Sequence, residues 1–118
     1  MTSTDQSWAT EFLTKQVELL NAKDTAGLAN RYAPDATFVR FDGIRHGRDE
    51  IKKLFDDYIL ENPEIISLDG AMISEDVILY KAAERLSGKL LWAIGTLVFV
   101  DGLVWRQTAT FIETLPTE

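Results

Sequence analysis

The order of apolar and polar positions divides the chain into a helical first half and a β-rich second half. Apolar side chains recur at helical spacing from a cap at Ser3 or Thr4 to about residue 21, and again over about residues 48–60. A shorter helix between these two is expected to start at Asp24, whose side chain suits an N-cap, and to end near Tyr32. The pattern therefore predicts three helices before residue 64.

Beyond residue 64 the apolar pattern changes to the period of two that is typical of β-strands. Asp101-Gly102 is the strongest turn signal, because both positions of a two-residue hairpin favour positive φ. The predicted strands are 36–41, which precedes a turn-rich connection at 42–47 and the third helix, then 65–73 with a bulge or tight turn at Asp69-Gly70, 77–86, 89–100 and 103–114. Helices followed by strands give an α+β domain, since each apolar helix stripe has to cover a sheet face.

Composition limits the classes of protein that the chain can represent. Its 118 residues predict one domain, 1–118, and a net charge of −7 disfavours nucleic-acid binding. The absence of cysteine excludes disulfides and thiolate nucleophiles, and a single histidine with scattered acids lacks metal-ligand spacing, so we expect neither a metal nor a cofactor. There is no apolar run of about 20 residues and no secretory signal, so we expect no membrane partner and a cytoplasmic location.

Turn and packing motifs in the first half resemble those of a known superfamily. They are Leu20-Asn21-Ala22-Lys23-Asp24, Leu28, Tyr32-Ala33-Pro34-Asp35-Ala36-Thr37, and Gly43 and Gly47 with Ile51 and Phe55. The chain resembles the nuclear transport factor 2-like (NTF2-like) superfamily over nearly its whole length, and most closely its SnoaL-like and steroid Δ-isomerase-like branch. This resemblance implies a cone-shaped α+β barrel, with three N-terminal helices packed on a strongly curved antiparallel sheet around a pocket, usually in a homodimer. Because enzymes and binding modules share this fold, the fold alone does not define the function.

The resemblance also implies positions for the steroid-isomerase machinery, which consists of a carboxylate base and an oxyanion hole made by a tyrosine and a protonated acid. These positions fall on Arg40, Gln16 and Thr96, respectively. Arginine does not accept a proton at neutral pH, and threonine is a weaker donor than a buried acid, so steroid-type isomerisation is disfavoured. The epoxide-hydrolase arrangement of a related branch is disfavoured too, because adjacent Glu84 and Arg85 point to opposite faces of a strand.

The candidate pocket residues come from the helix stripes and from the alternation of the strands. We assign the alternate positions from Trp105 to Phe111 to the pocket side of the last strand. The expected substrate-binding residues are Gln16, Arg40, Tyr58, Trp92, Thr96, Trp105, Gln107 and Phe111. For Arg40 two interpretations remain open, an anchor for a carboxylate and a structural salt bridge with Asp42, Glu84 or an acid of the third helix. Gln16 is either a group aimed into the cavity or a buried amide paired with a backbone carbonyl.

The segment 89–100 is apolar on both faces, and a strand of this kind has to be covered on both sides. The helices can cover the concave face of the sheet. We therefore expect a homodimer that forms through the convex face.

Two hypotheses for the function follow. In the first, the protein binds a small, largely hydrophobic molecule with a carbonyl or carboxylate group and lacks the steroid-isomerase base. In the second, it is a small cofactor-independent isomerase, cyclase or hydro-lyase, in which His46 and Asp42 transfer the proton and Arg40 holds the substrate anion. A lone histidine in such a loop is more often an exposed or capping residue than a catalytic base. An enzyme of this kind needs an acid or histidine that faces the pocket and has a partner. Only the loop with Asp42 and His46 offers one, so the pattern slightly favours binding.

Overall fold

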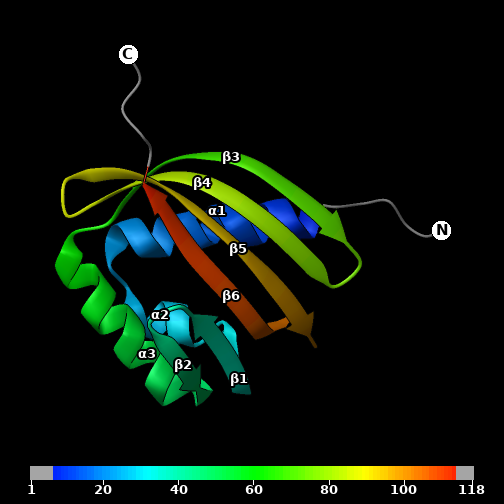
Figure 1. Ribbon diagram of the computed structural model, residues 1–118. Helices are drawn as coiled ribbons and strands as arrows, with labels where there is room; N and C mark the ends of the chain where they lie inside the picture. The colour runs from blue at the N-terminus through cyan, green and yellow to red at the C-terminus, as the bar shows by residue number, and fades with distance from the viewer. Residues whose placement is uncertain (1–6, 114–118) are drawn as a thin grey trace.

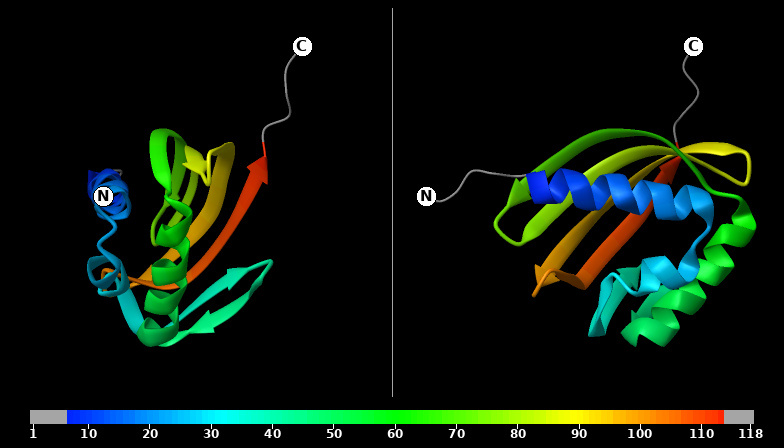
Figure 2. Two further views of the ribbon diagram at one scale, coloured as in Figure 1. Left: turned by 90° about the vertical axis from the view of Figure 1, so that its left-hand side faces the viewer. Right: turned by 180° about the vertical axis from the view of Figure 1, so that it is seen from behind.

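Six strands form one curved sheet, and three helices lie against its concave side and at one end (Figures 1 and 2). The computed structural model describes residues 7–113. The elements are α1 (Ser7–Ala22), α2 (Thr25–Ala29), β1 (Tyr32–Arg40), β2 (Gly43–His46), α3 (Gly47–Tyr58), the 3-10 helix η1 (Ile59–Glu61), β3 (Glu64–Ser74), β4 (Val77–Leu86), β5 (Lys89–Val100) and β6 (Leu103–Glu113). Helix α1 packs against β3, and α3 packs against β1 and β2.

The strands lie in the order β2-β1-β6-β5-β4-β3. The predicted α+β class with a cone-like, strongly curved sheet is confirmed. Two details differ from the prediction. The sheet is mixed, because β1 pairs in parallel with β6 while the other neighbours are antiparallel. It is also open, with β2 and β3 as its two edges, so the helices and not a closed barrel complete the enclosure.

Local turn chemistry sets most element ends. The side chain of Asp24 accepts a hydrogen bond of 2.9 Å from the backbone N of Gly27, as expected for an N-cap, but α2 ends at Ala29 because Tyr32 already pairs with β6. Segment 43–46, expected as turns, forms the edge strand β2. Asp101 and Gly102 have φ of 54° and 79°, which confirms the predicted hairpin turn. The proposed caps Ser3 and Thr4, and Thr114, lie outside the described residues.

Irregular pairing occurs at two positions that matter for the site. The interruption predicted at Asp69-Gly70 is a register shift within the single strand β3. A second shift lies in the β5–β6 hairpin, where Val98 pairs with Arg106 and Phe99 with Val104. Trp105 is thus an extra residue of β6, a β-bulge. Beyond it, each residue of β6 pairs with β5 one position away from its partner in a regular hairpin, so the other alternate set of β5 side chains shares its face.

Side chains between the concave face of the sheet and the helices make up the core. Its most deeply buried large residues are Leu28, Tyr32, Ile51, Ile78, Leu97 and Val104. Of the helices described, none combines the length and the apolar character needed to cross a membrane.

Candidate functional site

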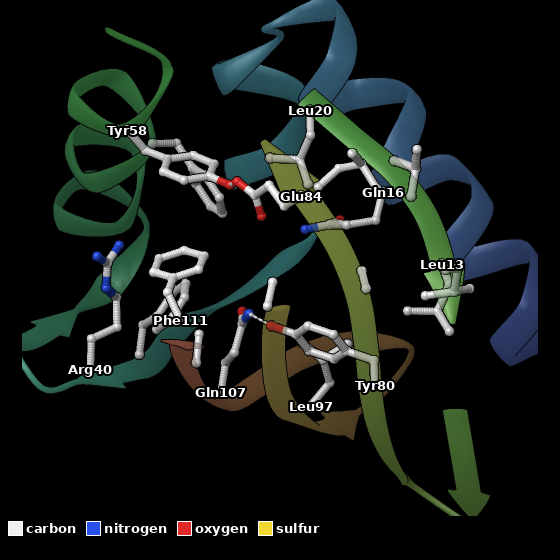
Figure 3. Close-up of a pocket in the computed structure, with 18 of the residues that line it drawn as sticks. Leu13, Gln16, Leu20, Arg40, Tyr58, Tyr80, Glu84, Leu97, Gln107 and Phe111 are labelled. Carbon is white, nitrogen blue, oxygen red and sulfur yellow. Dashed lines mark hydrogen bonds between the residues drawn. The ribbon is translucent and has the colours of Figure 1, made fainter. Parts of the chain in front are cut away.

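A small cavity of about 90 Å³ lies between the concave face of the sheet and the helices (Figure 3). It exists because the sheet carries small side chains where it faces the helices. Ala82 pairs with Ala93 on neighbouring strands, and Ala109 lies on the next strand. Larger residues surround this floor: Leu13, Gln16, Val17 and Leu20 of α1, Leu54, Phe55 and Tyr58 of α3, and Phe38, Arg40, Ile65, Leu68, Tyr80, Glu84, Leu97, Gln107 and Phe111 of the strands. Most of the wall is therefore apolar.

Glu84 is the buried acid of this wall. It lies on β4, and its side chain is only 1% exposed. The hydroxyl of Tyr58, from α3, donates a hydrogen bond to its Oε2 atom. Burial raises the pKa of Glu84 to about 7, although the positive charge of Arg40 lowers it in part. Both the acid and the carboxylate are therefore populated at neutral pH, which is the property that proton transfer requires.

A chain of hydrogen bonds crosses the core behind the cavity. The Nη1 atom of Arg31 donates to Oε1 of Gln16 at 2.8 Å, and Gln16 is hydrogen-bonded in turn to the Tyr32 hydroxyl. The Tyr32 hydroxyl donates to Oε1 of Gln107, whose Nε2 atom donates to the Tyr80 hydroxyl at 3.2 Å. Every link has the same direction, from the guanidinium toward Tyr80. Because aligned hydrogen bonds polarise one another, the chain makes the Tyr80 O–H a better donor.

The two tyrosines in this chain of hydrogen bonds, Tyr32 and Tyr80, stay protonated, so their hydroxyl groups can donate. Burial raises the pKa of Tyr32 well above its usual range, and the nearby Tyr80 raises it further. Burial also raises the pKa of Tyr80, against smaller opposing effects of its hydrogen bond with Gln107 and of the charge on Arg40. The Tyr80 oxygen accepts from Gln107, so its own hydrogen is the one that can be offered to a ligand in the cavity.

Arg40 lies at the cavity wall and also forms one of the salt bridges that the sequence left open, the one with Asp42. Its guanidinium lines the cavity, with Cζ 5.3 Å from the centre of the Phe111 ring. Its Nε atom also lies 3.3 Å from Oδ1 of Asp42, so the structural salt bridge forms. The positive charge is therefore partly neutralised before any ligand arrives.

The comparisons with known proteins fit this geometry. A structure of an NTF2-like protein of unknown function from Burkholderia xenovorans aligns over 98% of this chain and 91% of its own, with a TM-score of 0.84 and 14% identity. The chain has the NTF2-like fold. A SnoaL-like protein of unknown function from Burkholderia thailandensis aligns over 92% of this chain and 98% of its own, with a TM-score of 0.77 and 16% identity.

A protein with a ketosteroid isomerase-like fold from Catenulispora acidiphila aligns over 85% of this chain and 84% of its own, with a TM-score of 0.73 and 15% identity. No family model and no curated protein matches the chain. The fold implied by the sequence motifs is thus confirmed. Identities this low carry no information on the reaction or the ligand.

Within the NTF2-like fold, the residues predicted to bind substrate fall into two groups. Gln16, Arg40, Tyr58, Gln107 and Phe111 line the cavity. Trp92 and Thr96 lie on the outer face of β5, which corrects their assignment to the pocket side. The bulge at Trp105 is the reason, because it pairs Gln107 with Leu97, whereas a regular hairpin would pair it with Thr96. Trp105 packs against the core outside the cavity, with the Cζ atom of Arg106 3.7 Å from its ring centre.

The two residues predicted to transfer a proton lie outside the cavity wall. His46 ends the edge strand β2, and its exposed ring has Nδ1 3.3 Å from Oγ1 of Thr37. Asp42 is half exposed and pairs with Arg40 and, at 4.0 Å, with Arg45. The two residues thus have different partners in the structure. Across residues 7–113, no three histidines or acids are grouped to hold a metal ion.

Sequence reasoning missed Glu84, although a signal was present. Along β4, the residues at alternate positions that face inward are Ile78, Tyr80, Ala82, Glu84 and Leu86. An acid at an inward position of an otherwise apolar series marks either a buried pair or a functional group. From the sequence, Glu84 was considered as one possible salt-bridge partner of Arg40 and as a residue that points away from Arg85. The second inference is consistent with the observed burial of Glu84 and exposure of Arg85.

Proposed function

We propose that this protein binds a small, largely hydrophobic molecule that carries a carbonyl oxygen. The observation that supports this proposal is the buried apolar cavity with a polar group at each of two places on its wall, Glu84 with Tyr58 and Tyr80 with Gln107. Pockets for small molecules typically combine an apolar wall with a few converging polar groups that fix orientation.

The size of the cavity limits the ligand. Its volume of about 90 Å³ is closer to that of a cavity of ~150 Å³ that holds benzene than to the ~300–1,000 Å³ of pockets for drug-sized ligands. A single ring or a short branched chain matches this space. The volume thus gives a second reason, independent of the missing base, against a four-ring steroid.

The chemistry of the wall favours a neutral carbonyl over a carboxylate. The Tyr80 hydroxyl can donate to a carbonyl oxygen, and the hydrogen-bond chain from Arg31 strengthens this donor. A carboxylate would share the cavity with Glu84, and the guanidinium that could compensate its charge, that of Arg40, is already paired with Asp42. Two like charges in an apolar space are costly.

Cyclohexanone is a suitable probe for this proposal. Saturation-transfer NMR and thermal unfolding should detect its binding, and a probe at 100 times its dissociation constant should stabilise the protein by about 2.7 kcal/mol. Ala82→Leu places three more carbons in the cavity and should abolish the signal. Ala83→Leu makes the same change at the next residue, which faces outward, and should retain it. Equal binding by both variants would place the ligand elsewhere.

A second candidate function is cofactor-independent isomerase, cyclase or hydro-lyase activity on such a ligand. The observation that favours it is the Glu84 carboxyl, which faces the cavity and has a pKa of about 7. The proton transfer assigned from the sequence to His46 and Asp42 has less support, because both residues lie outside the cavity wall.

We also propose that the protein forms a homodimer through the outer face of the sheet. A transverse row of paired residues crosses all six strands on this face: Ile44, Val39, Thr108, Thr96, Leu79 and Met72. Ile44 is 56% exposed and Met72 is 73% exposed. Four of the six residues of the row are apolar, and the row spans about 24 Å, which suits the standard interface of ~800 Å² per partner.

A further inference from the structure

A second and larger hollow lies at the end of the molecule where α1 begins. It is an open groove of about 590 Å³ between the first turns of α1, the β3–β4 turn and the β5–β6 turn. The right-hand view of Figure 2 shows the start of α1 at the same end of the molecule as these two turns. The groove shares no lining residue with the cavity described above. Its wall consists of Trp8, Glu11, Phe12, Arg31, Glu75, Asp76, Phe99, Asp101 and Gly102.

Three aromatic rings form one side of the groove. Trp8 and Phe12 are four residues apart on α1, so their side chains share a face of the helix. Each ring meets that of Phe99 from β5 nearly at a right angle, with centroid distances of 5.2 and 4.9 Å and interplanar angles of 86° and 88°. Phe12 and Phe99 are buried, whereas Trp8 is 37% exposed. The indole of Trp8 is therefore the ring that this side offers to a ligand.

The aromatic side of the groove already contacts one cation, the guanidinium of Arg31. Its Cζ atom lies 3.6 Å from the centre of the Phe12 ring. The Nη1 atom donates to the backbone oxygen of Phe12 at 3.0 Å and to Oε1 of Gln16 at 2.8 Å, which holds the guanidinium in place. Cations are attracted to the faces of aromatic rings, and most strongly to tryptophan. The ring best suited to a further cation is thus the exposed one.

Carboxylates supply the charge around the rest of the groove. They belong to four of its lining residues, Glu11, Glu75, Asp76 and Asp101. Within residues 7–113, no ion pair neutralises any of these four carboxylates. The opposing positive charges are Arg31 and the partial charge of roughly one half at the start of a helix. Negative charge is therefore in excess at the groove.

The spacing of the carboxylates indicates the kind of cation. In the described part of the chain, no three acids are close enough together to hold a metal ion. Negative charge spread around an aromatic surface suits a bulky organic cation, whose charge is diffuse and needs no direct ligand. A quaternary ammonium group has this property, because methyl or methylene groups cover its nitrogen and leave it without a hydrogen to donate.

We propose that this groove is a binding site for a small quaternary ammonium compound. The methyl groups of the ligand pack on the indole of Trp8, and the surrounding carboxylates balance its charge. The site is separate from the cavity and does not depend on the function proposed for it.

Choline and its neutral isostere 3,3-dimethyl-1-butanol are matched probes, because a carbon replaces the charged nitrogen in an otherwise equal shape. NMR titration of the labelled protein gives both affinities. Choline should shift the indole N–H signal of Trp8 and the backbone amide signals of Asp101 and Gly102, and should bind about tenfold more tightly than the alcohol. Equal affinities for the two probes, or no shift of these signals by choline, would overturn the proposal.

Trp8→Leu tests the aromatic part of the site. The variant keeps an apolar side chain and removes the ring face, so the affinity for choline, followed at the Gly102 amide, should fall by about three- to tenfold. Trp92→Leu is the matched control, because Trp92 lies on the outer face of β5, and it should leave the affinity unchanged. An unchanged affinity in Trp8→Leu would contradict the proposal.

Asp101→Asn tests the charge, and its asparagine tolerates the positive φ of 54° at this turn position. The affinity for choline should fall by about threefold, and that for the alcohol should not change. Asp57→Asn makes the same change at an exposed position of α3, outside the groove, and should have no effect. Equal losses in the two variants would mean that only the net charge of the protein attracts choline, which would overturn the site.

Two further measurements exclude other occupants and other places. Calcium chloride, compared with sodium chloride at equal ionic strength, should not displace choline, and selective displacement by calcium would identify a metal site instead. Ala82→Leu fills the cavity between sheet and helices and should retain the full affinity for choline. Loss of choline binding in this variant would place choline in the cavity and overturn the inference, whereas failure of cyclohexanone to bind the wild type would affect only the proposed function.

Discussion

Tyr58 and Glu84 are 26 positions apart in the chain and meet inside the cavity, where the tyrosine hydroxyl donates a hydrogen bond to the carboxyl group. The contact joins α3 to β4 through the apolar space that separates helix and sheet. A carboxyl group in such a place remains ionisable only because a donor and a distant positive charge offset part of its lost hydration. The pair therefore combines a structural link with a group that titrates near neutral pH.

The contribution of Glu84 to the stability of the protein should decrease as the pH rises from about 4.5 to 7. Its pKa of about 7 in the folded state exceeds the ordinary value of 4.5, so the folded state keeps a proton that the unfolded state has lost. Above pH 7 the free energy of unfolding should have lost on the order of 3 kcal/mol of the contribution that Glu84 makes below pH 4.5.

Urea denaturation of the wild type and Glu84→Gln at pH 5 and pH 8 measures this effect. Because glutamine does not titrate, the stability of the wild type relative to the variant should fall by about 2–3 kcal/mol between the two pH values. Other carboxylates titrate in both proteins and cancel in the comparison. A relative stability that stays constant would mean that Glu84 has an ordinary pKa.

The hydrogen-bond chain behind the cavity should act as a coupled unit. Tyr32→Phe leaves Oε1 of Gln107 without its donor in a buried site, which should cost about 1–3 kcal/mol. Adding Gln107→Leu should cost less in this variant than in the wild type, with an interaction energy of about 0.5–3 kcal/mol in a double-mutant cycle.

The exposed ion pair of Lys89 and Glu113 provides the control cycle for this measurement. Its atoms are 3.2 Å apart, but both side chains are largely solvent-accessible, so the interaction energy should be below about 1 kcal/mol. Equal interaction energies in the two cycles would show that burial does not strengthen the hydrogen bond between Tyr32 and Gln107. The measurement is chemical denaturation of each variant at constant pH.

Gly95 allows Tyr80 to approach the neighbouring strands. A Cβ atom at this position would lie 2.3 Å from the backbone oxygen of Thr108 and 2.4 Å from the Tyr80 hydroxyl oxygen. Gly95→Ala should therefore displace Tyr80, break its bond with Gln107 and destabilise the protein by about 1–3 kcal/mol. Gly70→Ala is the control, because a Cβ there meets no atom within 4 Å, and it should change the stability by less than about 0.5 kcal/mol. Equal unfolding midpoints for the two variants in urea would contradict this account of Gly95.

The sequence allowed the elements of the fold to be predicted wherever a local signal was sufficient. The side chain of Asp24 and the pair Asp101-Gly102 define a cap and a turn by their own chemistry, and both features occur in the structure. The parallel pairing of β1 with β6 depends on contacts between residues some 70 positions apart, such as Phe38 and Gln107. Local periodicity carries no information on such pairing.

The inner face of β5 could not be assigned from the sequence. Both faces of this strand are apolar, so the pattern gives no preference, and the faces follow from the register with β6. The bulge at Trp105 changes that register by one residue and moves Thr96 to the outer face. For β4 the alternation was clear, and Glu84 at an inward position was the observation that could have located the site.

The outer face of the sheet provides the test of the proposed dimer. Leu79 lies in the transverse row on β4, next to the edge strand β3, and is 47% exposed, and an aspartate there would place two buried charges at a symmetric interface. We expect the wild type to sediment as a dimer at micromolar concentration and Leu79→Asp to sediment as a monomer. Leu60→Asp makes the same change in η1, away from the sheet, where the side chain is 82% exposed, and should remain dimeric. A monomeric wild type would contradict the proposal, and a dimer that persists in Leu79→Asp would place the interface on another face.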